Sequence, residues 1–291
     1  MSRNQLEAEF ASLHPTALFN RRDFLVTSLG TGFALAVQPV EAQSLITTNS
    51  DGLLAGEIKV PVADGEMIGY RAAPANARNV PVLLVVSEVF GVHEHIADVC
   101  RRLAKHGYLA IAPELFARYG NPRGYASIPE LFANVVSKAD DAVVMTDLDA
   151  CVAWAGKNGG DISKLGITGF CWGGRITWLY TAHNLKVTAA VAWYGKLDGN
   201  PTTLQPAYPI DVVTTIKTPV LGLYGATDQG IPLADVEAMR QALEKQGSKS
   251  QIHVYPGVGH AFHADYRPSY RKAEAEDGWQ RMLAWFKSNG V

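Results

Sequence analysis

The sequence predicts an α/β fold in which a mainly parallel sheet has helices on both faces and an antiparallel hairpin at its N-terminal edge. Short runs of β-branched and leucine residues alternate with longer helix-like segments, which is the order of βαβ units. No internal repeat, low-complexity tract or linker divides the chain. Its 291 residues, 47% of them apolar, are enough for one large core. We therefore expect a single domain over residues 43–291.

The charges and cysteines narrow the class of function. The formal net charge is −2 and no basic stripe is present, so we expect no binding to nucleic acid. The three cysteines form no CxxC pair, and Cys100 and Cys151 stand in helical patterns that favour buried packing. We expect a monomer that acts on a small molecule, with no cofactor and no metal.

The first forty residues differ from the rest. Arg21 and Arg22 precede an uncharged run, residues 24–37, and the small-residue sequence "VEA" follows. This order is typical of a twin-arginine export signal cleaved near Ala42, so residues 1–42 are predicted to be a signal peptide and the mature protein periplasmic. The apolar run is too short for a stable membrane span. The alternative is an N-terminal amphipathic helix on a cytoplasmic protein.

The domain is expected to begin with a hairpin and a buried strand. Two alternating segments in "GEIKVPVADGEMIGYRAAP" are joined by Asp64 and Gly65, a hairpin signal. The run "VPVLLVV" has no polar position, which is typical of a strand buried on both faces of a parallel sheet. The segments expected next are a helix over 95–106, a strand in "YLAIAPEL", an irregular passage over 116–129 and a helix over 138–157.

The second half continues the alternation. The strand "KLGITGF" leads into the helix "GRITWLYTAHN", and the last elements are the strands "VTAAVAWYG", "PVLGLYGATD" and "SQIHVYPGVG" with the helices "LADVEAMRQALEKQG" and "EAEDGWQRMLAWFKSNG". Ligands of such sheets bind at the carboxyl ends of the strands. Four chemically active residues follow strand ends here, namely Glu88, Cys171, Asp228 and His260.

The stretch "GFCWGG" has the spacing of a nucleophile elbow, with Cys171 where a serine is usual. Gly169, Gly173 and Gly174 permit a sharp strand-to-helix turn with close backbone contacts. At the amino end of the next helix, backbone N–H groups and the helix dipole favour a thiolate. The same stretch is also compatible with tight strand–helix packing alone, so the elbow by itself leaves catalysis open.

The other strand ends favour catalysis. Cys171, Asp228 and His260 follow one another in the chain order of the nucleophile–acid–histidine triad. His260 would accept the thiol proton, and Asp228 would fix the tautomer of the imidazole and stabilise the imidazolium. Taken singly, Asp228 is also compatible with a turn-forming role and His260 with a plain loop histidine. Three such residues in this order predict a triad.

These motifs, with "YGATD", "YPGVGHAF", "SEVFGVHEHI" and "APELFAR", resemble those of the dienelactone hydrolase family, which has the α/β-hydrolase fold. The similarity runs from about residue 56 to the C-terminus. The resemblance implies hydrolysis of an ester or lactone, the named reaction being the opening of 4-carboxymethylenebut-2-en-4-olide to maleylacetate. It also implies that Cys171 is the nucleophile and that Asp228 and His260 are its partners. Glu88 would be a carboxylate near the resting thiol, and Arg118 would bind the substrate carboxylate.

The position of Glu88 in the sequence also suggests a functional role, independently of the resemblance. A carboxylate that ends a wholly apolar strand is costly to bury unless it is paired, although a solvated loop position is the alternative. The resemblance supplies the Cys171 thiol as a hydrogen-bond donor to Glu88. The oxyanion hole is then expected from the backbone N–H groups of Trp172, after the nucleophile, and Val89, after Glu88.

Two departures from the family pattern bear on the substrate. Ala261 and Ala264 stand where the family's best-known type has a serine and an arginine that contact the substrate carboxylate. Arg267 is nearby but not aligned with that arginine. Because bidentate arginine contacts are strong, their loss predicts weaker recognition of a carboxylate.

Four other functions are weighed against this reading. His93 and His95 flank Glu94 in "VHEHI", but the spacing is not that of a zinc protease, so a metal hydrolase is disfavoured. A redox role for Cys171 lacks a resolving cysteine in the motif. A carboxylesterase with another substrate and a non-catalytic binding protein of the same fold stay open.

Overall fold

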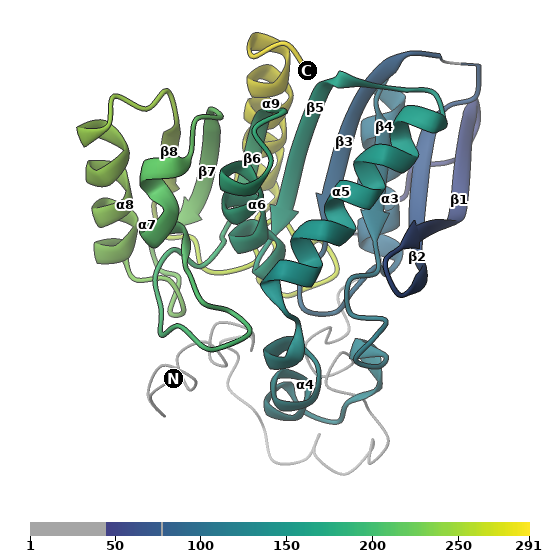
Figure 1. Cartoon of the computed structure of the whole chain (residues 1–291). Coiled ribbons are helices and arrows are strands. Elements are labelled where there is room, and N and C mark those ends of the chain that lie inside the picture. The colour runs from purple at the N-terminus through teal and green to yellow at the C-terminus, as the bar shows by residue number, and fades with distance from the viewer. Residues whose placement is uncertain (1–44, 77) are drawn as a thin grey trace.

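The computed structural model describes residues 45–76 and 78–291, so the predicted signal peptide, residues 1–42, lies outside the described residues (Figure 1). Within them, eight strands form one sheet in the order β1-β2-β4-β3-β5-β6-β7-β8. The pairs β1–β2 and β2–β4 are antiparallel, and the others are parallel. The strands are β1 (Leu53–Val62), β2 (Gly65–Pro74), β3 (Val80–Val86), β4 (Leu109–Pro113), β5 (Gly160–Phe170), β6 (Val187–Trp193), β7 (Val220–Gly225) and β8 (Gln251–Tyr255).

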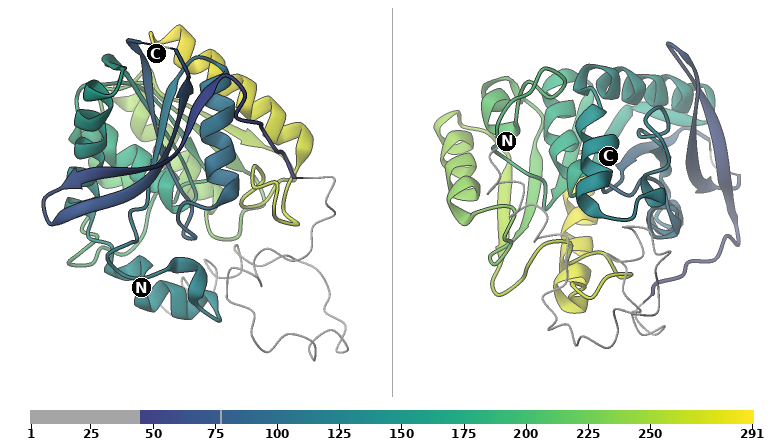
Figure 2. Two further views of the ribbon diagram at one scale, coloured as in Figure 1. Left: turned by 90° about the vertical axis from the view of Figure 1, so that its right-hand side faces the viewer. Right: turned by 90° about the horizontal axis from the view of Figure 1, so that it is seen from below.

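Helices cover both faces of this sheet, which confirms the predicted fold class. In the views of Figure 2, α3 and α9 lie on one face, and α5 and α6 lie on the other. The helices are α3 (Glu94–Lys105), α4 (Ile128–Asn134), α5 (Asp141–Lys157), α6 (Trp172–His183), α7 (Pro209–Val212), α8 (Leu233–Lys245) and α9 (Lys272–Ser288). None of those in the described ranges is both long and apolar enough to pass through a bilayer.

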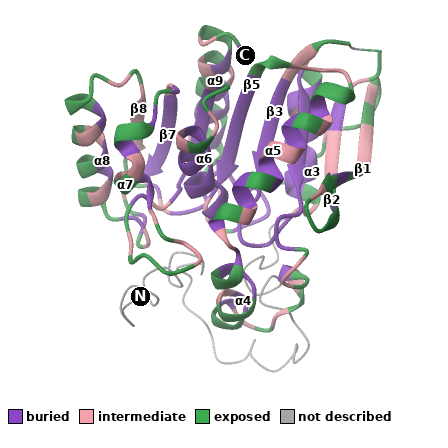
Figure 3. Ribbon diagram, viewed as in Figure 1, coloured by how far each residue is buried: buried purple, intermediate pink, exposed green. Residues whose placement is uncertain are grey.

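The central strands make the core, and the hairpin is the partly exposed edge (Figure 3). All five residues of β4 are buried, as are residues 82–86 of β3, because helices pack on both sides of these strands. In the hairpin, Val60 and Met67 pair across the strands and are buried, whereas Leu54 and Ile68 are exposed. The predicted turn at Asp64 and Gly65 is confirmed, since Val62 pairs with Gly65.

Two helix boundaries differ from the sequence prediction for capping reasons. The helix expected over 138–157 begins at Asp141, because Asp140 accepts a hydrogen bond from the N–H of Ala142 at 2.9 Å and so caps it. The passage expected to be irregular over 116–129 already contains the start of α4. Ser127 caps that short helix by accepting from the N–H of Glu130, in the Ser-x-x-Glu pattern of a helix start.

Candidate active site

The carboxyl ends of the parallel strands lie along one edge of the sheet, the lower edge in Figure 1, with α4 beyond it. Glu88 follows β3, Cys171 follows β5, Asp228 follows β7 and His260 follows β8. Contacts and charges link these four residues at that edge. The fold therefore brings together four residues that are far apart in the chain, as expected for residues that follow the carboxyl ends of parallel strands.

Cys171 occupies a strained turn between β5 and α6. Its φ is 55° and its ψ is −116°, a conformation that a residue other than glycine rarely adopts. Its N–H donates to the carbonyl of Trp193 at 3.0 Å, and its carbonyl accepts from the N–H of Gly174 at 2.9 Å. The side chain is thus held at the amino end of α6, where the helix dipole stabilises a negative charge.

The glycines of this turn allow backbones to approach closely. A Cβ on Gly173 would lie 2.3 Å from the carbonyl oxygen of Val86, and one on Gly174 would lie 2.5 Å from that of Trp193. The amino end of α6 is therefore packed directly against the ends of β3 and β6. Any larger side chain would move the nucleophile away from both strands.

His260 and Asp228 form a buried pair. His260 Nδ1 lies 2.6 Å from Asp228 Oδ2, and Asp228 Oδ1 accepts from the N–H of Gly230 at 2.9 Å. Burial by itself would lower the pKa of His260, but the charges of Asp228 and Cys171 outweigh it and raise the pKa well above its ordinary value. Nε2 is buried and makes no well-aligned hydrogen bond with another described residue, but the Cys171 side chain is close enough to interact with the imidazole and raise its pKa. The imidazole thus has one nitrogen fixed and the other available for a proton from Cys171.

Glu88 is buried, with 1% of its surface exposed, and it is paired as a buried carboxylate requires. Its Oε2 accepts a hydrogen bond from the hydroxyl of Tyr266, while Oε1 has no hydrogen-bond partner among the described residues. Burial, followed by the charge of Glu88, raises the pKa of Tyr266 well above its ordinary value, so this hydroxyl keeps its proton. The solvated alternative for Glu88 is wrong.

Tyr194 is a further polar group at this edge. It follows β6, has a φ of 37°, and packs its ring on that of His260 with centroids 5.1 Å apart. Its hydroxyl is buried and has no hydrogen-bond partner among the described residues. Burial, and then the charges of Glu88 and Cys171, raise the pKa of Tyr194 well above its ordinary value. The strand-end rule could have found Tyr194, whereas Tyr266 carries no comparable signal.

The two predicted oxyanion-hole donors are backbone groups in the two turns that meet here. Trp172 is the first residue of α6, and Val89 stands in the turn after β3. Neither N–H donates a hydrogen bond to another described residue. The first N–H groups of a helix have no intrahelical acceptor, so the Trp172 N–H is available for a ligand.

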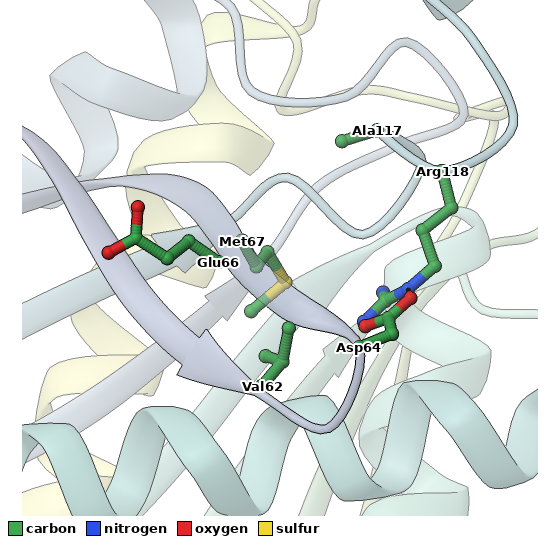
Figure 4. A pocket seen from close by; sticks show the side chains of 6 residues that line it. All are labelled: Val62, Asp64, Glu66, Met67, Ala117 and Arg118. Carbon is green, nitrogen blue, oxygen red and sulfur yellow. Dashed lines mark hydrogen bonds and ion pairs between the residues drawn. The ribbon is translucent and has the colours of Figure 1, made fainter.

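Arg118 makes its hydrogen bonds with Asp64 and Asp147 rather than with the four strand-end residues. Its guanidinium donates to Asp64 at 2.6 and 2.7 Å and to Asp147 at 3.0 Å, and these hydrogen bonds raise its pKa. It lines a pocket of about 230 Å³ beside the β1–β2 turn together with Met67 and Ala117 (Figure 4). Its contact with a substrate carboxylate stays a prediction.

The remaining predicted residues are placed as follows. Ala261 and Ala264 are fully buried, and Arg267 is 2% exposed, so Arg267 does not present an exposed guanidinium in their place. Cys100 and Cys151 are buried in the core, which confirms their packing role, and burial raises their pKa values. No group of three or more potential ligand side chains in the described part of the chain is arranged to hold a metal ion.

The close approach at Gly173 predicts a large effect of a small substitution. Gly173→Ala would place a methyl group against the carbonyl of Val86, and we expect the free energy of unfolding, measured in urea, to fall by about 3 kcal/mol. The matched control is Gly124→Ala, at an exposed glycine with no atom within 4 Å of the added Cβ, which should lose less than about 1 kcal/mol. Equal losses would show that the contact with β3 does not limit this position.

Comparison with known proteins agrees with this architecture. The model of the dienelactone hydrolase family matches residues 67–290. A protein of Methylorubrum extorquens named "Putative carboxymethylenebutenolidase" is 56% identical over 286 residues, which cover 98% of each chain. The crystal structure of a dienelactone hydrolase homologue from Klebsiella pneumoniae is 56% identical, covers 81% of this chain and 98% of its own, and superposes with a TM-score of 0.80.

A more distant structure shows the fold alone. An alpha/beta hydrolase of Penicillium is 15% identical, covers 81% of this chain and 99% of its own, and has a TM-score of 0.62. The chain therefore has the α/β-hydrolase fold and belongs to the dienelactone hydrolase family.

Proposed function

We propose that this protein hydrolyses an ester or lactone bond with a Cys171–His260–Asp228 triad, through an acyl-enzyme intermediate. The observation that carries the proposal is the buried His260–Asp228 pair, 2.6 Å apart, together with the nearby Cys171 side chain, which raises the pKa of the same imidazole. The strained elbow that presents Cys171 supports the same role.

The chemistry would proceed in two halves. Cys171 gives its proton to His260, and the sulfur attacks the carbonyl carbon, moving the π electrons onto the carbonyl oxygen. The N–H groups of Trp172 and Val89 would stabilise that oxyanion. Collapse expels the leaving oxygen, which takes the proton from His260. A water molecule, deprotonated by His260, then attacks the thioester and releases the acid and the thiol.

Glu88 has a supporting role in this proposal. The Tyr266 hydroxyl donates to Oε2. Oε1 is therefore the oxygen that would accept a hydrogen bond from the Cys171 thiol in the resting enzyme. The charges of Glu88 and Cys171 both act on the hydroxyl of Tyr194, which keeps its proton. This hydroxyl could donate a hydrogen bond to either group when it carries a negative charge. Both tyrosines would therefore stabilise negative charge around the sulfur.

For the substrate we propose a lactone or ester of the carboxymethylenebutenolidase type, because relatives at 52% identity or above carry that name. A carboxylesterase acting on a neutral ester is a second candidate that one observation favours. Arg118, the residue implied for carboxylate recognition, already has Asp64 and Asp147 as partners, and Ala261 and Ala264 supply no charge.

We also propose that residues 1–42 direct twin-arginine export and that the enzyme acts in the periplasm. The support is the pair Arg21 and Arg22 before an uncharged run that ends near Ala42. The chain just after this site is bound to the domain, since the N–H of Ile46 donates to Asp265 Oδ2 at 2.9 Å. Cleavage near Ala42 would leave this contact intact.

Loss of the thiol tests the nucleophile. Cys171→Ala should lower kcat for a dienelactone and for p-nitrophenyl acetate by at least about a thousandfold, because no sulfur remains to form the thioester. Prior alkylation of the wild-type protein should have the same effect, and Cys100→Ala should have little. If Cys171→Ala retains hydrolysis, the triad is refuted; if the wild-type protein hydrolyses neither compound, the binding-protein alternative is favoured.

Arg118→Ala separates the two substrate classes. If Arg118 exchanges its aspartate partners for a substrate carboxylate, KM should rise about tenfold for the dienelactone and less than twofold for neutral p-nitrophenyl acetate. Steady-state kinetics of both substrates measures this difference, with Arg240→Ala, at a half-buried arginine of α8, as control. Equal changes in KM would remove Arg118 from recognition and favour the carboxylesterase.

The export proposal predicts that replacing Arg21 and Arg22 together by lysine retains the protein in the cytoplasm, because twin-arginine signals are read by a receptor rather than by charge alone. Fractionation of a bacterial host with this export route measures the distribution, and Arg3→Lys, outside the motif, is the control. An unchanged distribution would support the cytoplasmic alternative.

A further inference from the structure

The turn that follows β3, residues 88–92, carries two groups of the proposed mechanism, the side chain of Glu88 and the N–H of Val89. It is closed by a hydrogen bond of 3.2 Å from the N–H of Gly91 to the carbonyl of Glu88. Gly91 has a φ of 71°, a left-handed conformation that glycine adopts at little cost. The direction of the Val89 N–H therefore depends on what holds this turn in place.

Glu114 holds one side of the turn. It follows β4 directly, is 7% exposed, and its Oε2 accepts from the N–H of Val92 at 2.8 Å. A Cβ on Gly91 would lie 2.5 Å from both carboxylate oxygens, so the carboxylate is packed against the turn at a place that only glycine leaves open. Burial raises the pKa of Glu114, while the Val92 N–H and a nearby cation act in the opposite direction.

Arg123 is that cation and holds the other side. Its Nη1 donates to the carbonyl of Phe90 at 3.1 Å and to that of Val92 at 3.3 Å, and it lies 3.8 Å from Glu114 Oε2. The side chain reaches the turn from a 3₁₀ turn at Pro122–Gly124, in the passage between β4 and α4. Glu114 thus binds an N–H of the turn and Arg123 binds its carbonyls.

We propose that Glu114 and Arg123 are positioning residues that hold the 88–92 turn so that the N–H of Val89 is directed at the oxyanion. The inference rests on the proposed function, because it assigns a purpose to that N–H. The side-chain hydrogen bonds and the ion pair of the two residues go to this turn or to each other, apart from a hydrogen bond between Glu114 and the backbone of Phe116. Because most of these contacts are made with the turn, we expect the main effect of the two residues on catalysis to pass through it.

The test compares two reactions of the same sulfur. Hydrolysis of p-nitrophenyl acetate develops an oxyanion, whereas alkylation of Cys171 by iodoacetamide does not. Arg123→Met should lower kcat about 10- to 100-fold with KM nearly unchanged, and should leave the rate and pH profile of alkylation as in the wild type. Glu114→Ala should behave alike, while Glu114→Gln, which keeps an acceptor for the Val92 N–H, should recover most of the loss. Arg240→Met is the matched control.

Hydrogen exchange separates this inference from the proposed function. In Arg123→Met, amides of the peptide covering residues 88–92 should exchange at least about tenfold faster than in the wild type or in Arg240→Met, whether or not an ester is hydrolysed. Unchanged exchange overturns the inference. Faster exchange with equal losses of hydrolysis and alkylation also overturns it, because the pair would then support the thiol rather than the oxyanion hole. A wild type that hydrolyses no ester refutes the proposed function and, with it, the purpose assigned to Val89.

Discussion

The strained backbone of Cys171 is the constraint on which the site depends. A φ of 55° at a residue with a side chain persists only where the surroundings hold it, and here both neighbouring strands do so. The N–H of Cys171 is bound to the end of β6, and Gly173 packs against the end of β3. Glu88 and the strained Tyr194 belong to the segments that directly follow these two strands, and the charges of Glu88 and Cys171 both act on the Tyr194 hydroxyl. One backbone conformation therefore places the thiol, the carboxylate and the hydroxyl together.

Burial of charge explains how the remaining groups are arranged. Glu88 and His260 are both nearly inaccessible, and among the described residues each has one polar atom firmly paired and one without a well-aligned hydrogen bond: Tyr266 binds Oε2 of Glu88, and Asp228 binds Nδ1 of His260. An unpaired buried polar atom costs about 1–3 kcal/mol, so folding alone would not favour Glu88 Oε1, His260 Nε2 and the Tyr194 hydroxyl unpaired. These three atoms are where a thiol proton or a substrate oxygen would be bound. Such a cost is typical of functional sites.

The sequence predicted those parts of the molecule that follow from local rules. Alternation of strands and helices predicted the sheet, and the strand-end rule predicted Glu88, Cys171, Asp228 and His260 as neighbours. Contacts between irregular segments follow no such rule. Tyr266 reaches Glu88 across 178 positions of the chain, and Arg123 reaches the turn after β3 from a 3₁₀ turn. Only the folded chain defines these distances, so neither partner was predicted.

The partners of Arg118 show how such contacts alter chemistry as well as geometry. A guanidinium that already binds Asp64 and Asp147 must give up charge-assisted hydrogen bonds before it can bind a substrate carboxylate. Asp64 lies in the hairpin turn, so the edge of the sheet competes with the substrate for the same cation. Ala261 and Ala264 carry no charge that could offset that cost, and the cation whose charge reaches Tyr194 and Tyr266 is the buried Arg267. For a substrate carboxylate, the net gain at Arg118 is therefore smaller than it would be at an arginine with no partner.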